Sequence, residues 1–115
     1  MSFQNDVPIV QKAYDFYREF NNSLPNMSKH DRYSIGEKVG NKTLDLIEDL
    51  IYSSRTDRKN KLVRLEEAAT KLDVLKLLLR LAQDVKSIPT KKYLTLSEKL
   101  QEIGKMLGGW IRSLS

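Results

Sequence analysis

The stretch LDVLKLLLRLA, residues 72–82, decides the fold because its apolar residues follow the spacing of a helix. Eight of its eleven residues are Leu, Val or Ala. Leu72, Leu75 and Leu79 recur at intervals of three and four, which places them on one face of an α-helix. At about 100° per residue, further apolar residues point well away from that stripe. These outward-pointing residues are Val74, Leu77 and Leu81.

A helix that is apolar on more than one side must be covered on more than one side. A thick core inside the monomer would do this, as would a subunit interface. We favour the interface, because large exposed apolar patches usually mark contacts. Lys76 and Arg80 are polar interruptions one turn apart in this stretch, and we predict that they face a partner or line an assembly. The predicted partner or oligomer interface comprises Val74, Lys76, Leu77, Arg80 and Leu81.

The same three- and four-residue spacing recurs along the rest of the chain, and no segment alternates like a half-buried strand. The 115 residues suffice for a single domain, 1–115. The pattern predicts helices at about residues 7–24, 29–54, 57–87 and 91–113. Short connections make consecutive helices antiparallel neighbours. We therefore predict an all-α fold, an antiparallel up-down-up-down four-helix bundle.

Polar residues that can cap a helix precede the first three predicted helices. They are Asp6 for the first helix, Ser28 or the capping-box residue Ser34 for the second, and Thr56 or Asp57 for the third. The predicted core stripes are Val10, Ala13, Tyr14, Tyr17, Phe20 and Leu24; Ile35, Val39, Thr43, Leu46, Ile47, Leu50 and Ile51; Leu62, Leu65, Ala69, Leu72, Leu75, Leu79 and Ala82; and Leu96, Leu100, Ile103, Leu107, Trp110 and Leu114.

The composition excludes most catalytic and metal-binding chemistry. The chain has no cysteine and only one histidine, His30, so it cannot form a Cys–His pair, a cysteine-bound zinc site or a second imidazole ligand. We expect no catalytic centre, no metal and no cofactor. The N-terminus lacks the pattern of a signal peptide, and no apolar run approaches the roughly 20 residues that span a bilayer. We therefore expect a soluble, cytoplasmic protein with no membrane partner.

The net charge of +5 is concentrated at the predicted ends of the bundle. Basic clusters of this kind can neutralise phosphates, although cations near helix termini can also serve only solubility. The first predicted set of phosphate contacts, at the turn between the second and third helices, is Arg55, Arg58, Lys59, Lys61 and Arg64. The second set, at the opposite end, is Lys29, Arg32, Lys86, Lys91 and Lys92.

Two pairs of glycines lie four residues apart, which places each pair on one helix face and permits close packing. We predict that Gly104 and Gly108 let the fourth helix approach a neighbour, with the face of Gly36 and Gly40 as a candidate. Gly109 is expected to loosen or end the helix. The helix-packing set is completed by Trp110, which is expected to pack across the end of the bundle.

Three segments resemble the accessory variability determinant (Avd) proteins of diversity-generating retroelements. They are RYSIGEKVGNKTLDLIEDLI at 32–51, KLDVLKLLLRLAQDVKSI at 71–88 and KKYLTLSEKLQEIGKMLGGWI at 91–111. The wider group of four-helix-bundle proteins includes the ribosomal-RNA intervening-sequence proteins. The resemblance covers about residues 7–113.

The resemblance implies a four-helix bundle that assembles as a homopentamer with a basic surface and has no catalytic centre. It also implies two partners, the element's reverse transcriptase and its template-repeat RNA or an RNA/DNA hybrid, in mutagenic reverse transcription and retrohoming. Two alternatives stay open. One is an RNA-binding bundle of the ribosomal-RNA intervening-sequence type, and the other is a protein-only scaffold whose charge is incidental.

Overall fold

A computed structural model describes residues 8–114, and every regular element within them is helical. The long helices are α1 (Pro8–Asn21), α3 (Glu37–Arg55), α4 (Arg58–Asp84) and α5 (Thr90–Ser113). The short segments between α1 and α3 are the 3₁₀ turn η2 (Leu24–Asn26), the helical turn α2 (Lys29–Asp31) and the π-helical turn η3 (Arg32–Gly36). The predicted all-α fold is confirmed, while the predicted cap Asp6 lies outside the described residues.

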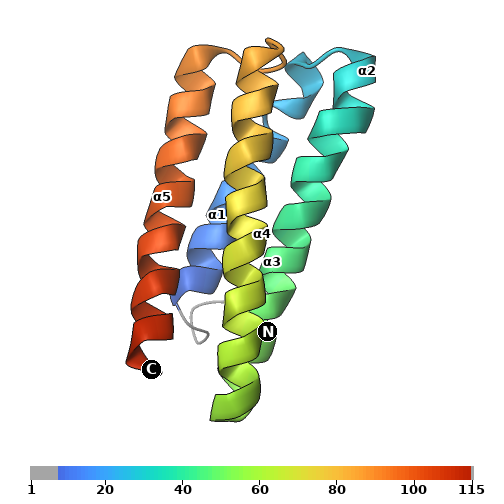
Figure 1. Ribbon diagram of the computed structural model, residues 1–115. Helices are drawn as coiled ribbons and strands as arrows, with labels where there is room; N and C mark the ends of the chain where they lie inside the picture. Colours follow the sequence, from blue (N-terminus) through green and yellow to red (C-terminus); the bar gives the residue numbers. More distant parts are fainter. Residues whose placement is uncertain (1–7, 115) are drawn as a thin grey trace.

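Consecutive long helices run in opposite directions along a common axis (Figure 1). Both α3 and α5 pack against α1 and α4, so the order around the bundle is α1, α3, α4, α5. The molecule measures 43 × 28 × 21 Å. The 27 residues of α4 rise by about 40 Å, so this helix spans the length of the rod. The predicted up-down-up-down topology is confirmed.

The core lies along the bundle axis, where each helix contributes a stripe of residues spaced by three and four. On α4 this stripe includes Ala68 rather than the predicted Ala69, because the spacing that Leu65 and Leu72 begin continues through Ala68. On α1 the fully buried Phe16 was not predicted. It lies at the centre of the stripe, which leaves the predicted Tyr14 and Tyr17 half-buried at its edges.

Two of the predicted helix caps are present. The Ser28 hydroxyl accepts a hydrogen bond from the Asp31 amide at 3.1 Å, and the Asp57 carboxylate accepts one from the Asn60 amide at 2.9 Å. The capping-box alternative at Ser34 is wrong. Its hydroxyl donates to the His30 carbonyl at 2.8 Å, the bond that a serine inside a helix makes.

The start of the second predicted helix contains a π-helical turn, η3, which the periodicity did not indicate. The Arg32 side chain at its beginning reaches back across the connection from α1. Its guanidinium donates to the Leu24 carbonyl at 3.1 Å and to the Met27 carbonyl at 3.3 Å. The Leu24 carbonyl also accepts from the Met27 amide at 3.1 Å, so Arg32 adds a second bond there and ties the connection to the start of η3.

The predicted packing of Gly104 against Gly36 and Gly40 is wrong. Gly36 and Gly40 face η2 and α1, whereas Gly104 faces Leu72 of α4. The reason is the order of the helices, which places α3 and α5 on opposite corners of the bundle. A Cβ atom at Gly104 would lie 3.5 Å from the Leu72 side chain, an ordinary contact, so this position does not require glycine.

At the end of α5 the helix continues through Gly109 to Ser113, so the expected loosening at Gly109 is also wrong. The Arg112 guanidinium lies over the glycine pair, 3.2 Å from where a Cβ of Gly108 would be. Trp110 packs against the core and lines a small apolar groove with Ile9 at the start of α1. The expected packing of Trp110 across the bundle end stays a prediction.

Gly36 and Gly40 provide a matched test of packing at the start of α3. A Cβ atom at buried Gly36 would lie 2.9 Å from the Leu24 side chain and 3.3 Å from the Asp31 carbonyl, whereas at Gly40 it would lie 3.8 Å from Tyr17. Gly36→Ala is expected to lower the free energy of unfolding by about 1 kcal/mol. Gly40→Ala is expected to raise it by up to about 1 kcal/mol. Urea unfolding measures both, and equal stability of the two variants would contradict the close packing at Gly36.

Candidate nucleic-acid and partner interfaces

The turn between α3 and α4 gathers cations at one end of the rod, which we call the lower basic end: Arg55, Arg58, Lys59 and Lys61. The first three are exposed and Lys61 is half-buried. Hydrogen bonds from Asn60 hold the Asp57 carboxylate and lower its pKa. Arg58 donates to the Leu114 carbonyl at 2.6 Å, so the end of α5 lies at this turn, as the topology predicted.

Arg64 belongs to a different arrangement from the other cations of the first predicted set. Its guanidinium lies 2.6 Å from the Asp49 carboxylate and 4.3 Å from the centre of the Tyr52 ring. The hydrogen bond to Asp49 raises the pKa of Arg64. Lys71 binds the other carboxylate oxygen of Asp49, also at 2.6 Å. These contacts join α3 to α4, so Arg64 serves the bundle rather than a surface for phosphates.

Asp49 and Lys71 are the members of this cluster that sequence reasoning missed. Asp49 is 2% exposed and lies between Leu46 and Leu50 on the buried face of α3. A carboxylate at a core position is almost always paired. The place of Asp49 within the apolar stripe was the sequence feature that could have indicated this cluster, because a buried carboxylate requires cations on the neighbouring helix.

The opposite end, which we call the upper basic end, carries Lys29, Lys86 and Lys91, all of them exposed. The Ser87 hydroxyl donates to the Asp31 carboxylate at 2.7 Å and joins the α4–α5 connection to α2. Two cations predicted for this end are engaged inside the molecule, Arg32 by backbone carbonyls and Lys92 by a carboxylate.

The carboxylate that binds Lys92 is Glu19 of α1, with the atoms 2.5 Å apart. This hydrogen bond lowers the pKa of Glu19. The pair connects α1 to α5, which are neighbours in the bundle. Lys92 is therefore occupied by the fold, and the exposed cations of this end are the ones available to a phosphate.

Lys86 ends α4 in a conformation that favours glycine, with φ of 63°. The Ser87 amide donates to the Ala82 carbonyl and the Lys86 amide to the Gln83 carbonyl, which is the bonding pattern of a Schellman motif. A lysine at this position exposes its charge at the tip of the upper basic end.

Lys86→Gly is expected to raise the free energy of unfolding by about 0.5–1 kcal/mol, because glycine adopts this conformation without steric cost. Lys86→Ala removes the same charge but keeps the steric cost, so its stability is expected to stay close to that of the wild type. Thermal unfolding compares the two variants. If they were equally stable, backbone strain at Lys86 would be disproved.

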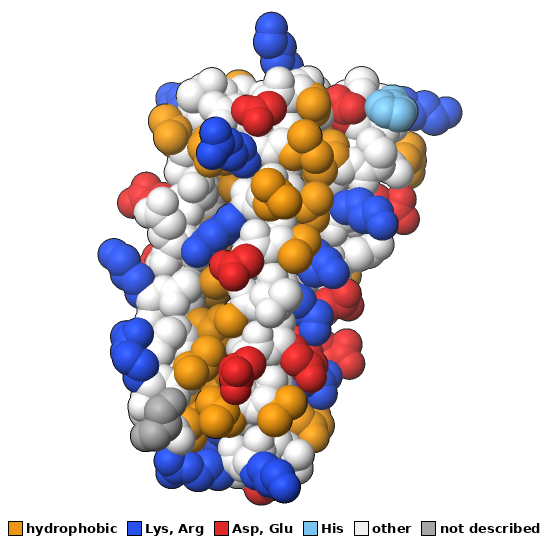
Figure 2. Space-filling model, viewed as in Figure 1, with side chains coloured by type: hydrophobic (Ala, Val, Ile, Leu, Met, Phe, Trp, Pro, Cys, Tyr) orange, Lys and Arg blue, Asp and Glu red, His pale blue; other side chains and the backbone are white. Residues whose placement is uncertain are grey.

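The outward side of α4 separates into an apolar and a basic flank. Figure 2 shows hydrophobic side chains gathered over the upper half of α4, with Lys and Arg side chains beside them toward α5, whereas the lower part of the seam with α5 is hydrophobic. Leu77 is 67% and Leu81 46% exposed, so their predicted outward orientation is confirmed. Val74 is half-buried. We call the following residues the apolar patch: Ile35, Leu77, Leu78, Leu81 and Val85.

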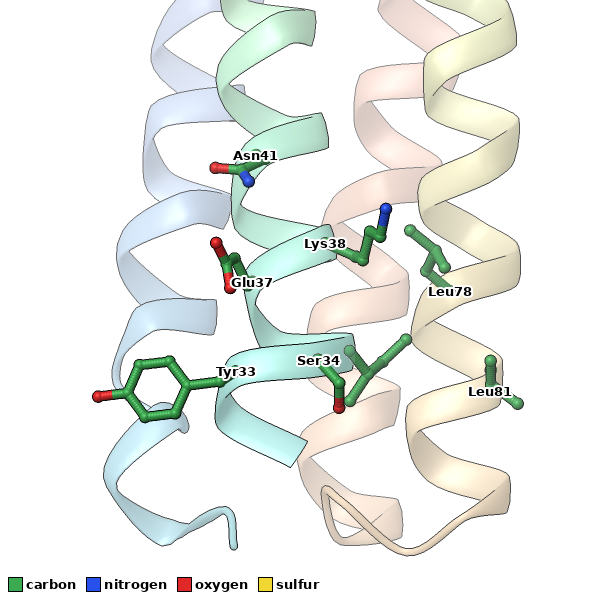
Figure 3. Close-up of a pocket in the computed structure, with 8 residues that line it drawn as sticks. Tyr33, Ser34, Glu37, Lys38, Asn41, Leu78 and Leu81 are labelled. Carbon is green, nitrogen blue, oxygen red and sulfur yellow. The ribbon is translucent and has the colours of Figure 1, made fainter. Parts of the chain in front are cut away.

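The apolar patch borders a groove of about 580 Å³ between α4 and the start of α3. In Figure 3, Leu78 and Leu81 line it from α4, Lys38 lies on the facing helix, and Tyr33 points away. Lys76 and Arg80, which were predicted on the same surface as Leu81, instead line a groove between α4 and α5. The structure thus divides the predicted interface between two flanks of one helix.

Within residues 8–114, no three carboxylate or imidazole side chains gather where they could hold a metal ion. None of the described helices combines the length and the apolar character that crossing a membrane requires. The features that stand out are the two basic ends, the apolar patch and the groove between α4 and α5.

The family model described as bAvd-like matches residues 7–114, nearly the whole chain. No curated protein and no solved structure matches the chain.

Proposed function

The chain belongs to the bAvd-like family, and on this premise we propose that it is a non-enzymatic accessory protein of a diversity-generating retroelement. Its proposed role is to bring the element's reverse transcriptase together with the template-repeat RNA in mutagenic reverse transcription and retrohoming. The family match over residues 7–114 is the observation that carries the proposal. The four-helix bundle alone would not carry it, since one fold serves many functions.

The proposed setting is the cytoplasm, a reducing compartment in keeping with a chain without cysteine.

The distribution of cations supports RNA as a partner. Arg58 and Lys59 are exposed at the lower basic end, and Lys29, Lys86 and Lys91 are exposed at the upper one. Lysine and arginine side chains that neutralise phosphates release counterions, which provides affinity without a requirement for sequence. The contacts that hold Arg32, Arg64 and Lys92 narrow the proposed RNA surface to the remaining cations.

The apolar patch supports assembly with further copies of the chain. It exposes Leu77, Leu81 and Val85 at 67%, 46% and 54% on one outward face of α4. We propose that this patch packs against another subunit in a closed ring, a homopentamer. In such a ring the patch contacts a different surface of the next subunit, because head-to-tail interfaces are heterologous.

The experiment that tests the proposed function is co-assembly with the reverse transcriptase encoded beside this chain. The three components, protein, reverse transcriptase and template-repeat RNA, are expected to elute together in size-exclusion chromatography. A neighbouring reverse transcriptase with a pair of template and variable repeats is also expected in the genome. Elution of the protein apart from both partners would contradict the proposal, and a gene inside a ribosomal-RNA insertion would favour the intervening-sequence alternative.

A further inference from the structure

The groove between α4 and α5 is lined by different kinds of residue from the grooves beside α3. It has a volume of about 420 Å³, within the range of pockets that hold small ligands. Tyr93, Ser97 and Gln101 recur every fourth residue along one face of α5. The facing wall consists of Lys76, Leu77 and Arg80 of α4.

The charged side chains that line this groove are both positive. No carboxylate lines it, whereas the grooves beside α3 include Glu37 and Glu48. Lys76 and Arg80 are exposed, and neither forms an ion pair within residues 8–114. The Lys76 ammonium lies 3.4 Å from where a Cβ of Gly104 would be, so it lies against α5 at one end of the groove.

An aromatic ring beside unpaired cations is the combination that binds single-stranded nucleic acid. In such sites bases stack on aromatic side chains while cations follow the phosphates. Tyr93 is half-buried, packs against the core and lines the groove. The Ser97 hydroxyl and the Gln101 amide provide donors and acceptors for the edge of a base. A base in a duplex cannot enter, because it is stacked and paired inside the helix.

We propose that the α4–α5 groove holds a single-stranded segment of RNA, with a base stacked on Tyr93 and the adjacent phosphates at Lys76 and Arg80. This inference rests on the proposed function, because it takes RNA as the ligand. The groove and the apolar patch share Leu77, while Lys76 and Arg80 lie on one flank of α4 and Leu78 and Leu81 on the other. Packing between subunits through Leu78 and Leu81 therefore leaves Lys76 and Arg80 on the uncovered flank of α4.

The experiment uses the full chain and a short single-stranded RNA that contains one 2-aminopurine, whose fluorescence falls when it stacks. Binding to the wild type is expected to quench this fluorescence. Tyr93→Leu is expected to abolish the quenching and to weaken binding about fivefold or more, while Tyr93→Phe keeps both. Lys76→Gln with Arg80→Gln is expected to lower the slope of log affinity against log salt by about 1.4. Lys105→Gln, on the exposed side of α5, is the matched control and keeps the wild-type quenching.

Thermal unfolding and light scattering verify that each variant keeps its fold and assembly. If the wild type binds RNA but neither Tyr93→Leu nor the double variant differs from it, the groove is not the site, while the proposed function stands. If the wild type binds no RNA at any salt concentration, the proposed RNA-binding function is overturned, and the assignment of the groove to RNA is overturned with it. Equal binding of duplex RNA would overturn the single-strand assignment. If polyglutamate bound as tightly as RNA, and the Tyr93→Leu variant kept that affinity, the groove would be assigned to an acidic protein segment instead.

Discussion

Substitution of Leu77 and Leu81 by glutamate is expected to convert the assembled protein into monomers. Both leucines are exposed in the isolated chain and lie on the outward face of α4, so the substitutions leave the core intact. Burial of each leucine in an interface contributes about 1.5–3 kcal/mol, and an unpaired carboxylate in its place adds a desolvation cost. A loss of about 4 kcal/mol or more raises the dissociation constant at least a thousandfold. Light scattering over a range of protein concentrations measures the change.

Thr95→Glu is the matched control for the introduced charge, since Thr95 is exposed on α5, away from the apolar patch. It is expected to leave the molar mass unchanged. Far-UV circular dichroism verifies that the Leu77→Glu, Leu81→Glu variant stays helical. A wild type that is monomeric at every concentration would show that the patch is not a subunit interface, as would a double variant that still assembles.

Charge reversal at the lower basic end is expected to remove most of the RNA affinity. The variant carries Arg58→Glu, Lys59→Glu and Lys61→Glu. Each phosphate contact to a single strand contributes about 0.7 to the slope of log affinity against log salt, so three contacts contribute about 2. At about 0.1 M salt this corresponds to a loss of roughly a hundredfold in affinity, before any repulsion from the new carboxylates. Fluorescence anisotropy with labelled RNA at several salt concentrations measures both quantities.

A control with the same change in net charge reverses Arg18, Lys38 and Lys105, which are exposed on three different helices. Its affinity is expected to fall less, and its salt slope to stay close to that of the wild type. Arg58 also bonds to the Leu114 carbonyl, so a variant with only the two lysines reversed separates RNA contact from packing at the bundle end. Unchanged affinity in both variants would assign the RNA to another surface.

The fold could be predicted closely because its boundaries depend on local features. The third helix was expected at 57–87 and is observed at Arg58–Asp84, where Asp57 caps its start and Lys86 ends it. The π-helical turn at Arg32–Gly36 could not be predicted in this way. It accompanies hydrogen bonds from Arg32 to carbonyls five to eight residues earlier, and no periodic pattern indicates them.

The candidate sites were predicted less completely, because the partner of each cation lies far along the chain. The sequence indicates that Arg64 and Lys92 are basic and near helix ends. It does not indicate that Asp49, fifteen residues before Arg64, and Glu19, seventy-three residues before Lys92, would engage them. The division of α4 into an apolar and a basic flank likewise depends on which helices cover it. The periodicity of α4 alone does not indicate that α3 lies on one side of it and α5 on the other.

We propose that this chain enables a reverse transcriptase to copy its template RNA. The most direct test of this proposal is the synthesis of cDNA from the template-repeat RNA by the neighbouring reverse transcriptase, with and without the protein. We predict cDNA with substitutions at template adenines when the wild type is present, and little or none in its absence or with the charge-reversed variant. The same yield and the same sequence of cDNA without the protein would contradict the account.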